Sequence, residues 1–344
     1  MVSVVGHDKE SASAERSNES VALIILIALV LGAAALSLLF GAGPSAGHTF
    51  LPVLAKTDPK IAGVILWEIR VPRTALALMV GFTLGLTGAA LQGFLRNPLA
   101  EPALIGASSG AALGAVAVFY FGLFGSGVIA LPFGGVAGAL AALAILFGLV
   151  GGAPSVTTLI LAGVAVNAAA GALTSLLLNL APNPFAYYEI SFWMMGSVAD
   201  RGLDHVALAA PFMIAGLGAV LWTARGLDAL TLGEDVAASL GVHLKRMRLA
   251  VIGGTGLAVG AGVAVTGVIG FVGLVVPYLV RPFVGHVPSK SLVPSGLAGA
   301  ALLTFADLLV RLLPGQQLQL GVVTALIGGP FFLMLILKRR SEIT

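Results

Sequence analysis

Charged side chains at the ends of long apolar runs are the residues of this sequence most able to do chemistry. Arg70 and Arg73 precede a run of 22 uncharged residues that ends at Arg96, and Asp307 stands four residues before Arg311. An arginine stays charged and offers a fixed fork of N–H donors that fits a carboxylate. Asp307 and Arg311 share a helix face and can pair. The pattern predicts binding of acidic groups, or arginines that only anchor helix ends at a membrane surface.

The motifs of catalysis and of cofactor binding are missing from the sequence. No Gly-Lys dipeptide occurs in its 344 residues, which excludes the usual phosphate-binding loop. There is no His-Glu-x-x-His motif and no nucleophile elbow, and the five histidines fall near predicted loops or tails. Without cysteine, neither a disulfide nor a thiolate metal site can form. We therefore expect no enzyme, with no catalytic residue, bound cofactor or metal site in this chain.

Composition places the chain in a membrane. It is 58% hydrophobic and 10% charged, against about 25% charged residues in an ordinary soluble domain. At about 1.5 Å per helical residue, the run between Arg73 and Arg96 covers about 33 Å, enough to cross a hydrocarbon core of about 30 Å. Apolar runs of this length lack the alternation of barrel strands. The predicted fold class is an all-α polytopic membrane protein.

Ten transmembrane helices are predicted from the apolar runs and from the glycines and prolines that interrupt them. They lie near residues 21–41, 61–95, 103–121, 128–150, 156–180, 205–224, 246–267, 269–284, 292–312 and 318–337. Glycines recur at helical spacing at 81, 85 and 88 and again at 253, 256 and 260. Small residues let helices approach closely in lipid, so close packing is the simpler reading and a surface that bends or lines a conduit is the alternative.

An even number of spans puts both termini on one side of the membrane. The basic run Lys338-Arg339-Arg340 marks that side as cytoplasmic, and most of the 18 lysines and arginines fall on it. We expect a cytoplasmic tail without fixed structure over residues 1–20, one transmembrane domain over 21–338, and a short cytoplasmic tail over 339–344.

Several dispersed motifs resemble one family, the permease subunits of binding-protein-dependent ABC importers for vitamin B12, ferric siderophores and haem. The resemblance covers residues 21 to 338. Its motifs are Arg70-Val-Pro-Arg73, Gln92, Arg96-Asn-Pro-Leu-Ala-Glu-Pro102, Trp193-Met-Met-Gly-Ser197, the segment from Leu232 to Val242, the segment from Gly267 to Pro277, Ala306-Asp307 and Gly321-Val-Val-Thr-Ala325.

Two positions depart from the pattern of that family. Tyr278 stands where the family usually has a histidine after Val-Pro, and Gln319 stands where a proline usually precedes the last helix. The second change removes a helix-start proline, so the beginning of the last helix is expected to differ.

The resemblance implies that Arg70, Arg73 and Arg311 dock a substrate-binding protein on the outer face. It also implies a cytoplasmic loop that couples the permease to an ATPase subunit. The coupling residues are Leu232, Gly233, Glu234, Val236, Ala237, Ser239, Leu240 and Gly241. We expect Val236, Ala237 and Leu240 to share one side of a short helix, and Ala237→Glu to abolish ATPase binding while the permease stays folded.

The resemblance further implies a cytoplasmic gate and a conduit. The gate residues are Asn97, Leu99, Val156 and Thr157, and Pro98 favours a turn there because it keeps the preceding residue out of a helix. Small residues of the fifth span, Ala168, Ala169 and Gly171, would line the translocation path.

The implied assembly is a homodimer in the bacterial inner membrane, with both termini cytoplasmic, two ATPase subunits and a periplasmic binding protein. ATP and Mg would be bound by the ATPase subunits and not by this chain, which interacts with membrane lipid and not with nucleic acid. The expected cargo is an iron chelate, with haem first, a ferric siderophore second and cobalamin third. An ion-coupled secondary carrier is the alternative from another class, and a passive channel or scaffold is a weaker one.

Overall fold

The computed structural model describes residues 2–40, 58–122, 130–151, 156–181, 183–313 and 318–343, and these contain helices and no β-strand. The helices, in chain order, are α1 (Val2–Leu39), α3 (Pro59–Val64), η1 (Ile65–Arg70), α4 (Val71–Phe94), η2 (Pro102–Ile105), α5 (Ala107–Tyr120), α6 (Ala130–Val150), α7 (Val156–Asn179), α8 (Pro184–Met194), α9 (Leu203–Trp222), α10 (Ala224–Leu230), α11 (Glu234–Ser239), α12 (Leu244–Thr266), α13 (Val272–Val284), α14 (Pro288–Leu312) and α15 (Leu320–Ile343).

The all-α membrane fold predicted from the sequence is confirmed. Among the described residues, seven helices are long and apolar enough to cross a membrane, and three shorter apolar helices complete the ten predicted positions. Two of the short ones, α5 with 14 residues and α13 with 13, are each only about 20 Å long, less than the hydrocarbon thickness of about 30 Å. As straight helices they are therefore too short to cross the hydrocarbon core on their own.

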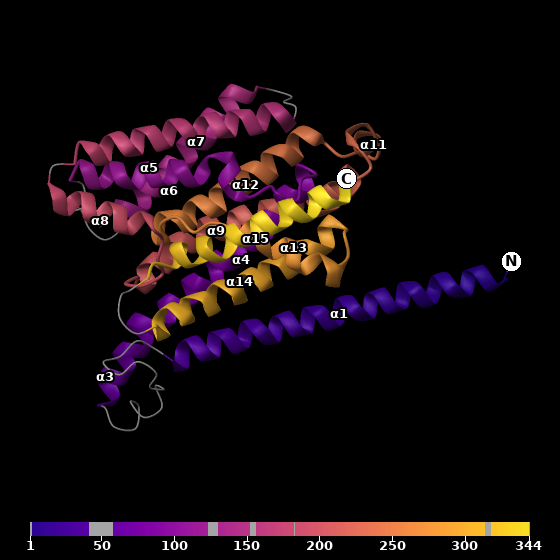
Figure 1. Cartoon of the computed structure of the whole chain (residues 1–344), viewed down its shortest axis with the longest axis horizontal. Helices are drawn as coiled ribbons and strands as arrows, with labels where there is room; N and C mark the ends of the chain where they lie inside the picture. Colours follow the sequence, from indigo (N-terminus) through magenta and orange to yellow (C-terminus); the bar gives the residue numbers. More distant parts are fainter. Residues whose placement is uncertain are drawn as a thin grey trace.

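The helices form one elongated bundle, with α7 at one edge and α1 at the opposite edge (Figure 1). Helices α4 and α12 lie at the centre, where most of their residues are buried, whereas few residues of α1 and α7 are. One end of the bundle carries α3 and α8, and the other carries α11 and both termini. The tail expected over residues 1–20 is helical from Val2 onward, as part of α1.

Glycines bring the central helices into backbone contact, as the packing interpretation predicts. A side-chain carbon on Gly85 would lie 2.1 Å from the Ser295 carbonyl oxygen of α14, and one on Gly88 would lie 2.0 Å from the Gly273 carbonyl oxygen of α13. Contacts this short leave no room for any side chain. Helices α4, α13 and α14 are therefore packed as one unit.

A π-helical turn interrupts the long helix that runs from Pro59 to Phe94. It covers Ile65–Arg70, directly before Val71 and Pro72. Proline has no N–H for the preceding helical turn, and a wider turn is one way to accommodate that loss. The distortion lies next to Arg70 and Arg73, so it helps to set the direction of both side chains.

Candidate functional site

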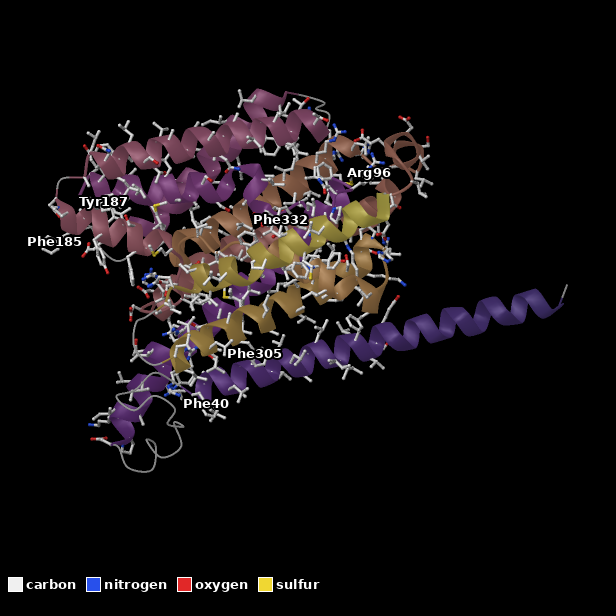
Figure 2. All side chains as sticks on the ribbon, viewed as in Figure 1. Phe40, Arg96, Phe185, Tyr187, Phe305 and Phe332 are labelled. Carbon is white, nitrogen blue, oxygen red and sulfur yellow. The ribbon has the colours of Figure 1, made fainter. Side chains whose placement is uncertain are left out.

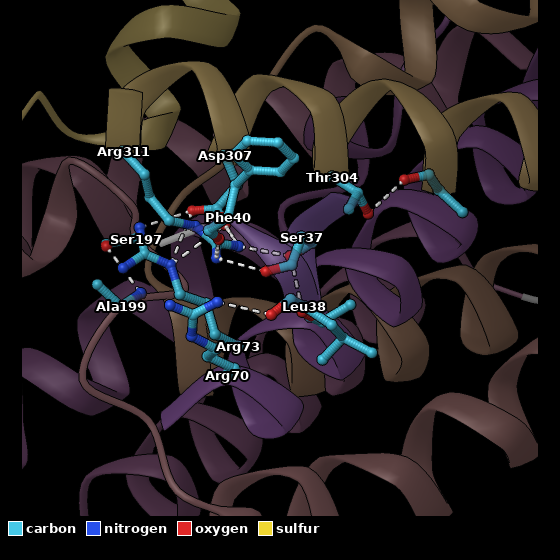
Figure 3. A network of polar contacts seen from close by, with 12 residues as sticks. Ser37, Leu38, Phe40, Arg70, Arg73, Ser197, Ala199, Thr304, Asp307 and Arg311 are labelled. Carbon is cyan, nitrogen blue, oxygen red and sulfur yellow. Dashed lines mark hydrogen bonds and ion pairs between the residues drawn. The ribbon is translucent and has the colours of Figure 1, made fainter. Parts of the chain in front are cut away.

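The carboxylate of Asp307 lies at the centre of a buried charge cluster at the α3 end of the bundle (Figure 3). Arg73 of α4 donates from Nε to both carboxylate oxygens at 3.1 Å and from Nη2 to Oδ1 at 2.8 Å. Arg311 donates from Nε to Oδ2 at 2.8 Å, and its Nη2 also bonds Oδ2. The predicted pairing of Asp307 with Arg311 is confirmed, and Arg73 shares the same carboxylate.

The cluster also holds the C-terminal end of α1. Arg311 donates from Nη2 to the Ser37 hydroxyl at 2.6 Å and from Nη1 to the Ser37 carbonyl at 3.1 Å, and Arg70 donates to the Leu38 carbonyl at 2.6 Å. The last carbonyls of a helix lack partners within it and carry partial negative charge, so cations there are favourable. Two of the three arginines therefore fasten the first span to the bundle.

The side chain of Arg73 reaches closer to the surface than those of Arg311 and Asp307. The side chain of Arg73 is 17% exposed, that of Arg311 3% and that of Asp307 1%. Within the cluster itself, three arginines and one aspartate leave two net positive charges. The site can thus attract an acidic partner, with Arg73 more exposed than Arg311.

A second candidate site lies at the opposite end, in the loop between α9 and α12. Helices α10 and α11 fold this loop, and the turns at Gly233 and Gly241 have φ angles of +107° and +86°, which favour glycine. Leu232 is 65% exposed and Leu240 64%, whereas Ala237 is fully buried. The expected shared face is not found, because Val236 and Leu240 project outward and Ala237 projects inward.

Polar contacts fix this loop to the transmembrane helices. Glu234 of α11 accepts from Arg248 of α12 at 2.9 Å, and the Asp228 carboxylate of α10 accepts from the backbone N–H of Ser289 at 2.8 Å. Ser289 lies in the first turn of α14, where backbone donors lack partners within the helix. A displacement of the loop would therefore act directly on α12 and α14.

The predicted gate residues lie at two helix ends. Asn97 and Leu99 form a tight turn after α4, in which Asn97 Oδ1 accepts from the Leu99 N–H at 3.0 Å, so the turn predicted from Pro98 is present. Figure 2 shows Arg96, the residue before this turn, at the α11 end of the bundle. Thr157 is exposed in the first turn of α7, and Val156 is the first residue of that helix, with its side chain outside the described residues.

The predicted lining residues Ala168, Ala169 and Gly171 are exposed on α7. The neighbouring Asn167 turns inward, where its Nδ2 donates to the Ala103 carbonyl at 2.7 Å and its Oδ1 accepts from the Ser109 hydroxyl at 2.7 Å. This partly buried amide fixes the rotation of α7, so that the small residues point away from the rest of the bundle.

Comparison with known proteins identifies the family. The chain matches the FecCD transport family over residues 24–338. The chain belongs to this family. It is 38% identical over 331 residues to the hemin transport system permease protein HmuU of Yersinia pestis, which covers 93% of this chain and 95% of that protein. It is 38% identical over 283 residues to the cobalamin import system permease protein BtuC of Halobacterium salinarum, covering 82% and 75%.

A solved structure agrees with this assignment. A metal-chelate type ABC transporter in an inward-facing conformation superposes with a TM-score of 0.81 at 32% identity, covering 92% of this chain and 98% of that one. The chain is therefore a multi-pass ABC importer permease of the FecCD family, a family that works with ATPase and binding-protein partners.

Sequence reasoning missed α8 of this FecCD permease. Asn183 caps the helix by accepting the Ala186 N–H at 2.8 Å, with Pro184 at its first position. These residues are a helix-start signal in the sequence. Tyr188 and Phe192 stack at 5.9 Å, and Figure 2 shows Phe185 at the same end of the bundle as Phe40.

The end of α8 and the loop after it carry the Trp193–Ser197 motif of the family, and this loop is fastened to the end of α12. The Ser197 N–H donates to the Thr266 carbonyl at 2.7 Å, and Arg201 donates from Nε to the Val265 carbonyl at 2.6 Å, both at the end of α12. Burial lowers the pKa of the Arg201 guanidinium, and the nearby Asp200 acts in the opposite direction. Arg201 thus serves as a cap.

The two departures from the family pattern lie at the contact of α15 with the bundle. The Tyr278 ring of α13 meets the Phe331 ring of α15 edge to face at 5.6 Å, so the aromatic residue packs where a histidine is usual. Gln319 is buried directly before α15, and its carbonyl accepts from the Val322 and Val323 N–H groups at 3.1 and 3.2 Å. Helix α15 therefore begins without a proline.

Proposed function

We propose that the chain is the homodimeric permease of an inner-membrane importer that moves an iron chelate, with haem the favoured cargo and both termini in the cytoplasm. One observation carries the proposal. A positively charged cluster around Asp307 lies at one end of the bundle, and an exposed apolar loop around Leu240 lies at the other end. Such a permease needs a partner on each side of the membrane.

The arginine cluster is the proposed docking site for the binding protein. Arg70, Arg73 and Arg311 gather around Asp307 and the end of α1, and the side chain of Arg73 is more exposed than that of Arg311. An acidic side chain of the binding protein would complete the coordination of the guanidinium groups. Charge pairs at the rim of an interface mainly set the docking register and the association rate.

The loop around α11 is the proposed coupling element. Leu232, Val236 and Leu240 expose apolar side chains outside the bundle, as expected for a surface that fits into a cleft of an ATPase subunit. Closure of two ATPase subunits on ATP would move the two loops of the dimer. Through Asp228 and Glu234 that motion would reach α14 and α12.

Helix α7 is the proposed dimer contact and wall of the conduit. Its exposed residues include Leu161, Ala168 and Leu176. In the single chain, no other helix among the described residues covers this apolar face, which has small residues at its middle. Two such faces would enclose a wide and weakly polar path. The turn at Asn97 and Leu99 and the start of α7 at Val156 and Thr157 would form the inner gate.

The identity of the cargo is the most specific part of the proposal. The hemin permease relative matches nearly the whole length of the chain, which supports haem. A ferric siderophore or cobalamin is the alternative within the family. An absorption spectrum of the binding protein purified with its ligand decides, because a Soret band identifies haem and its absence from a loaded binding protein excludes it.

Reconstitution tests the transport mechanism. Liposomes containing the permease, its ATPase and the binding protein should take up cargo only with ATP, and omission of the ATPase should stop uptake. Uptake driven by a proton gradient without ATP and without the ATPase would contradict the proposal and favour an ion-coupled secondary carrier.

A further inference from the structure

A crevice runs beside the contact between the first helix, α1, and the rest of the bundle. Between residues 19 and 39 of α1, only Ala33 and Ser37 are buried, so the helix touches its neighbours along a narrow seam. Two cavities open beside that seam. One, of about 310 Å³, lies at the α11 end between α1, α13 and α14, and the other, of about 260 Å³, lies farther along between α1, α4, α9 and α14.

The two cavities lie on the same side of both helices. On α14 their lining residues include Ser289, Val293, Leu297 and Ala300, and on α1 they include Ser20, Leu23 and Val30. Steps of three, four and seven residues keep side chains on one helix face. The cavities are therefore two parts of one crevice that runs along the α1 and α14 contact.

The polarity of the crevice changes along its length. At the α11 end, Lys290 forms an ion pair with Glu19, and both side chains are partly exposed. In the farther cavity the lining is apolar apart from Thr83, whose buried hydroxyl has no hydrogen-bond partner among the described residues. From Lys290 to Ala300 is about 15 Å of helix, half of a hydrocarbon core of about 30 Å. This is the depth of one leaflet.

We propose that the crevice binds one zwitterionic phospholipid, such as phosphatidylethanolamine, from the leaflet on the α11 side. Lys290 has ammonium protons left for the lipid phosphate, and the Glu19 carboxylate has oxygen lone pairs left for the lipid ammonium group. An acyl chain lies along Leu23, Val293 and Leu297 and reaches the cavity at Val30 and Phe82. The lipid fills the space that α1 leaves open.

Charge complementarity decides between lipid classes. An anionic headgroup would meet Glu19 at the same site as Lys290, and like charges at such short range repel. A zwitterionic headgroup matches both charges. The inference needs only that the chain spans a membrane, so it stands independently of cargo and partners.

The experiment uses the full-length chain in bilayers of phosphatidylethanolamine and phosphatidylglycerol in equal amounts. After extraction into mild detergent, mass spectrometry counts the phospholipid that stays bound to each chain. The wild type should retain one phosphatidylethanolamine molecule. Lys290→Gln and Glu19→Gln should each lower retention by roughly fivefold, the effect expected from about one surface charge contact.

Two bulky substitutions test the acyl part of the crevice separately. Val293→Trp and Ile214→Trp replace partly exposed lining residues and should displace the lipid without disturbing the buried core. Lys60→Gln and Leu309→Trp make the same changes at exposed positions outside the crevice and should retain it. Size-exclusion profiles and melting temperatures confirm that each variant is folded.

Three results would overturn the proposal. No retained lipid in the wild type, or equal retention in the wild type and all four crevice variants, rules out the site. Preferential retention of phosphatidylglycerol rules out the zwitterionic assignment.

Discussion

Asp307 accepts a hydrogen bond from Arg73 Nη2 at 2.8 Å, across 234 residues of sequence, and so joins α14 to α4. The same carboxylate accepts from Arg311, whose other donors hold α1. A single buried acidic side chain therefore fixes three helices at the end of the bundle where the binding protein is proposed to dock.

Replacement of Asp307 by asparagine should destabilise the permease. It would leave Arg311 buried without its counter-ion, which typically costs about 3–5 kcal/mol. We expect a lower melting temperature in detergent. Arg311→Met in the same chain should restore part of the loss because it removes the unpaired charge. An unchanged melting temperature in Asp307→Asn would show that the cluster does not hold the helices together.

Arg73→Ala should weaken docking of the binding protein and cost less stability than Asp307→Asn, because Arg73 is the more exposed partner of Asp307 and Arg311 remains as its counter-ion. At low salt we expect association to slow by about tenfold, and the difference should shrink as salt screens the charges. Surface plasmon resonance on nanodisc-embedded permease measures the rate. Lys60→Ala, at an exposed position of α3, serves as the control, and an equal effect of both changes would argue against a specific docking role.

The transmembrane helices could be predicted from sequence because long apolar runs dominate their signal. Helix α8 was missed because it lies between Asn183 and Met195 in a short stretch of mixed aromatic and polar residues, with no run long enough to cross a membrane. Asn183 and Pro184 nevertheless form a helix-start signal in the sequence.

The composition of the arginine cluster was only partly predictable. The pairing of Asp307 with Arg311 follows from their spacing, but Ser37 is 274 residues from Arg311, and an uncharged residue in an apolar run gives no sign of such a partner. The loop proposed for coupling shows a similar limit. At 100° per residue, Val236 of α11 and Leu240 directly after it lie on nearly the same side, whereas Ala237 points inward. A helix of six residues carries too little pattern to show which face is buried.

Leu240→Glu should abolish co-purification of the ATPase while the permease stays folded. The side chain is 64% exposed, so a carboxylate there remains in water and changes only the contact surface. Ala237→Glu should instead lower the melting temperature, because it places an unpaired charge at a fully buried position. Leu313→Glu, at an exposed leucine of the opposite end, is the matched control. Normal ATPase recovery with Leu240→Glu would remove this loop from the coupling role.

Asp228→Ala should destabilise the start of α14 by about 1 kcal/mol, the usual loss when a side-chain cap is removed. Val287, the residue before α14, has no side-chain acceptor, and Asp228 supplies one from α10. Hydrogen exchange of the Ser289 amide should accelerate. Asp228→Asn keeps an oxygen acceptor and should exchange nearly as slowly as the wild type. Equal exchange in the alanine variant and the wild type would show that the contact adds no protection.

Glu101 should make stability depend on pH. Burial raises the pKa of its carboxyl, and a hydrogen bond from the Phe271 N–H acts in the opposite direction. A raised pKa means that the folded state binds a proton more tightly than the unfolded state, so Glu101 lowers stability at high pH. This loss is relieved as the pH falls from the raised value toward the ordinary value of 4.5. Glu101→Gln should therefore melt at a higher temperature than the wild type near pH 8, and the two should converge near the lower end of that window. A constant difference between the two melting curves at every pH would show that Glu101 does not titrate in that range.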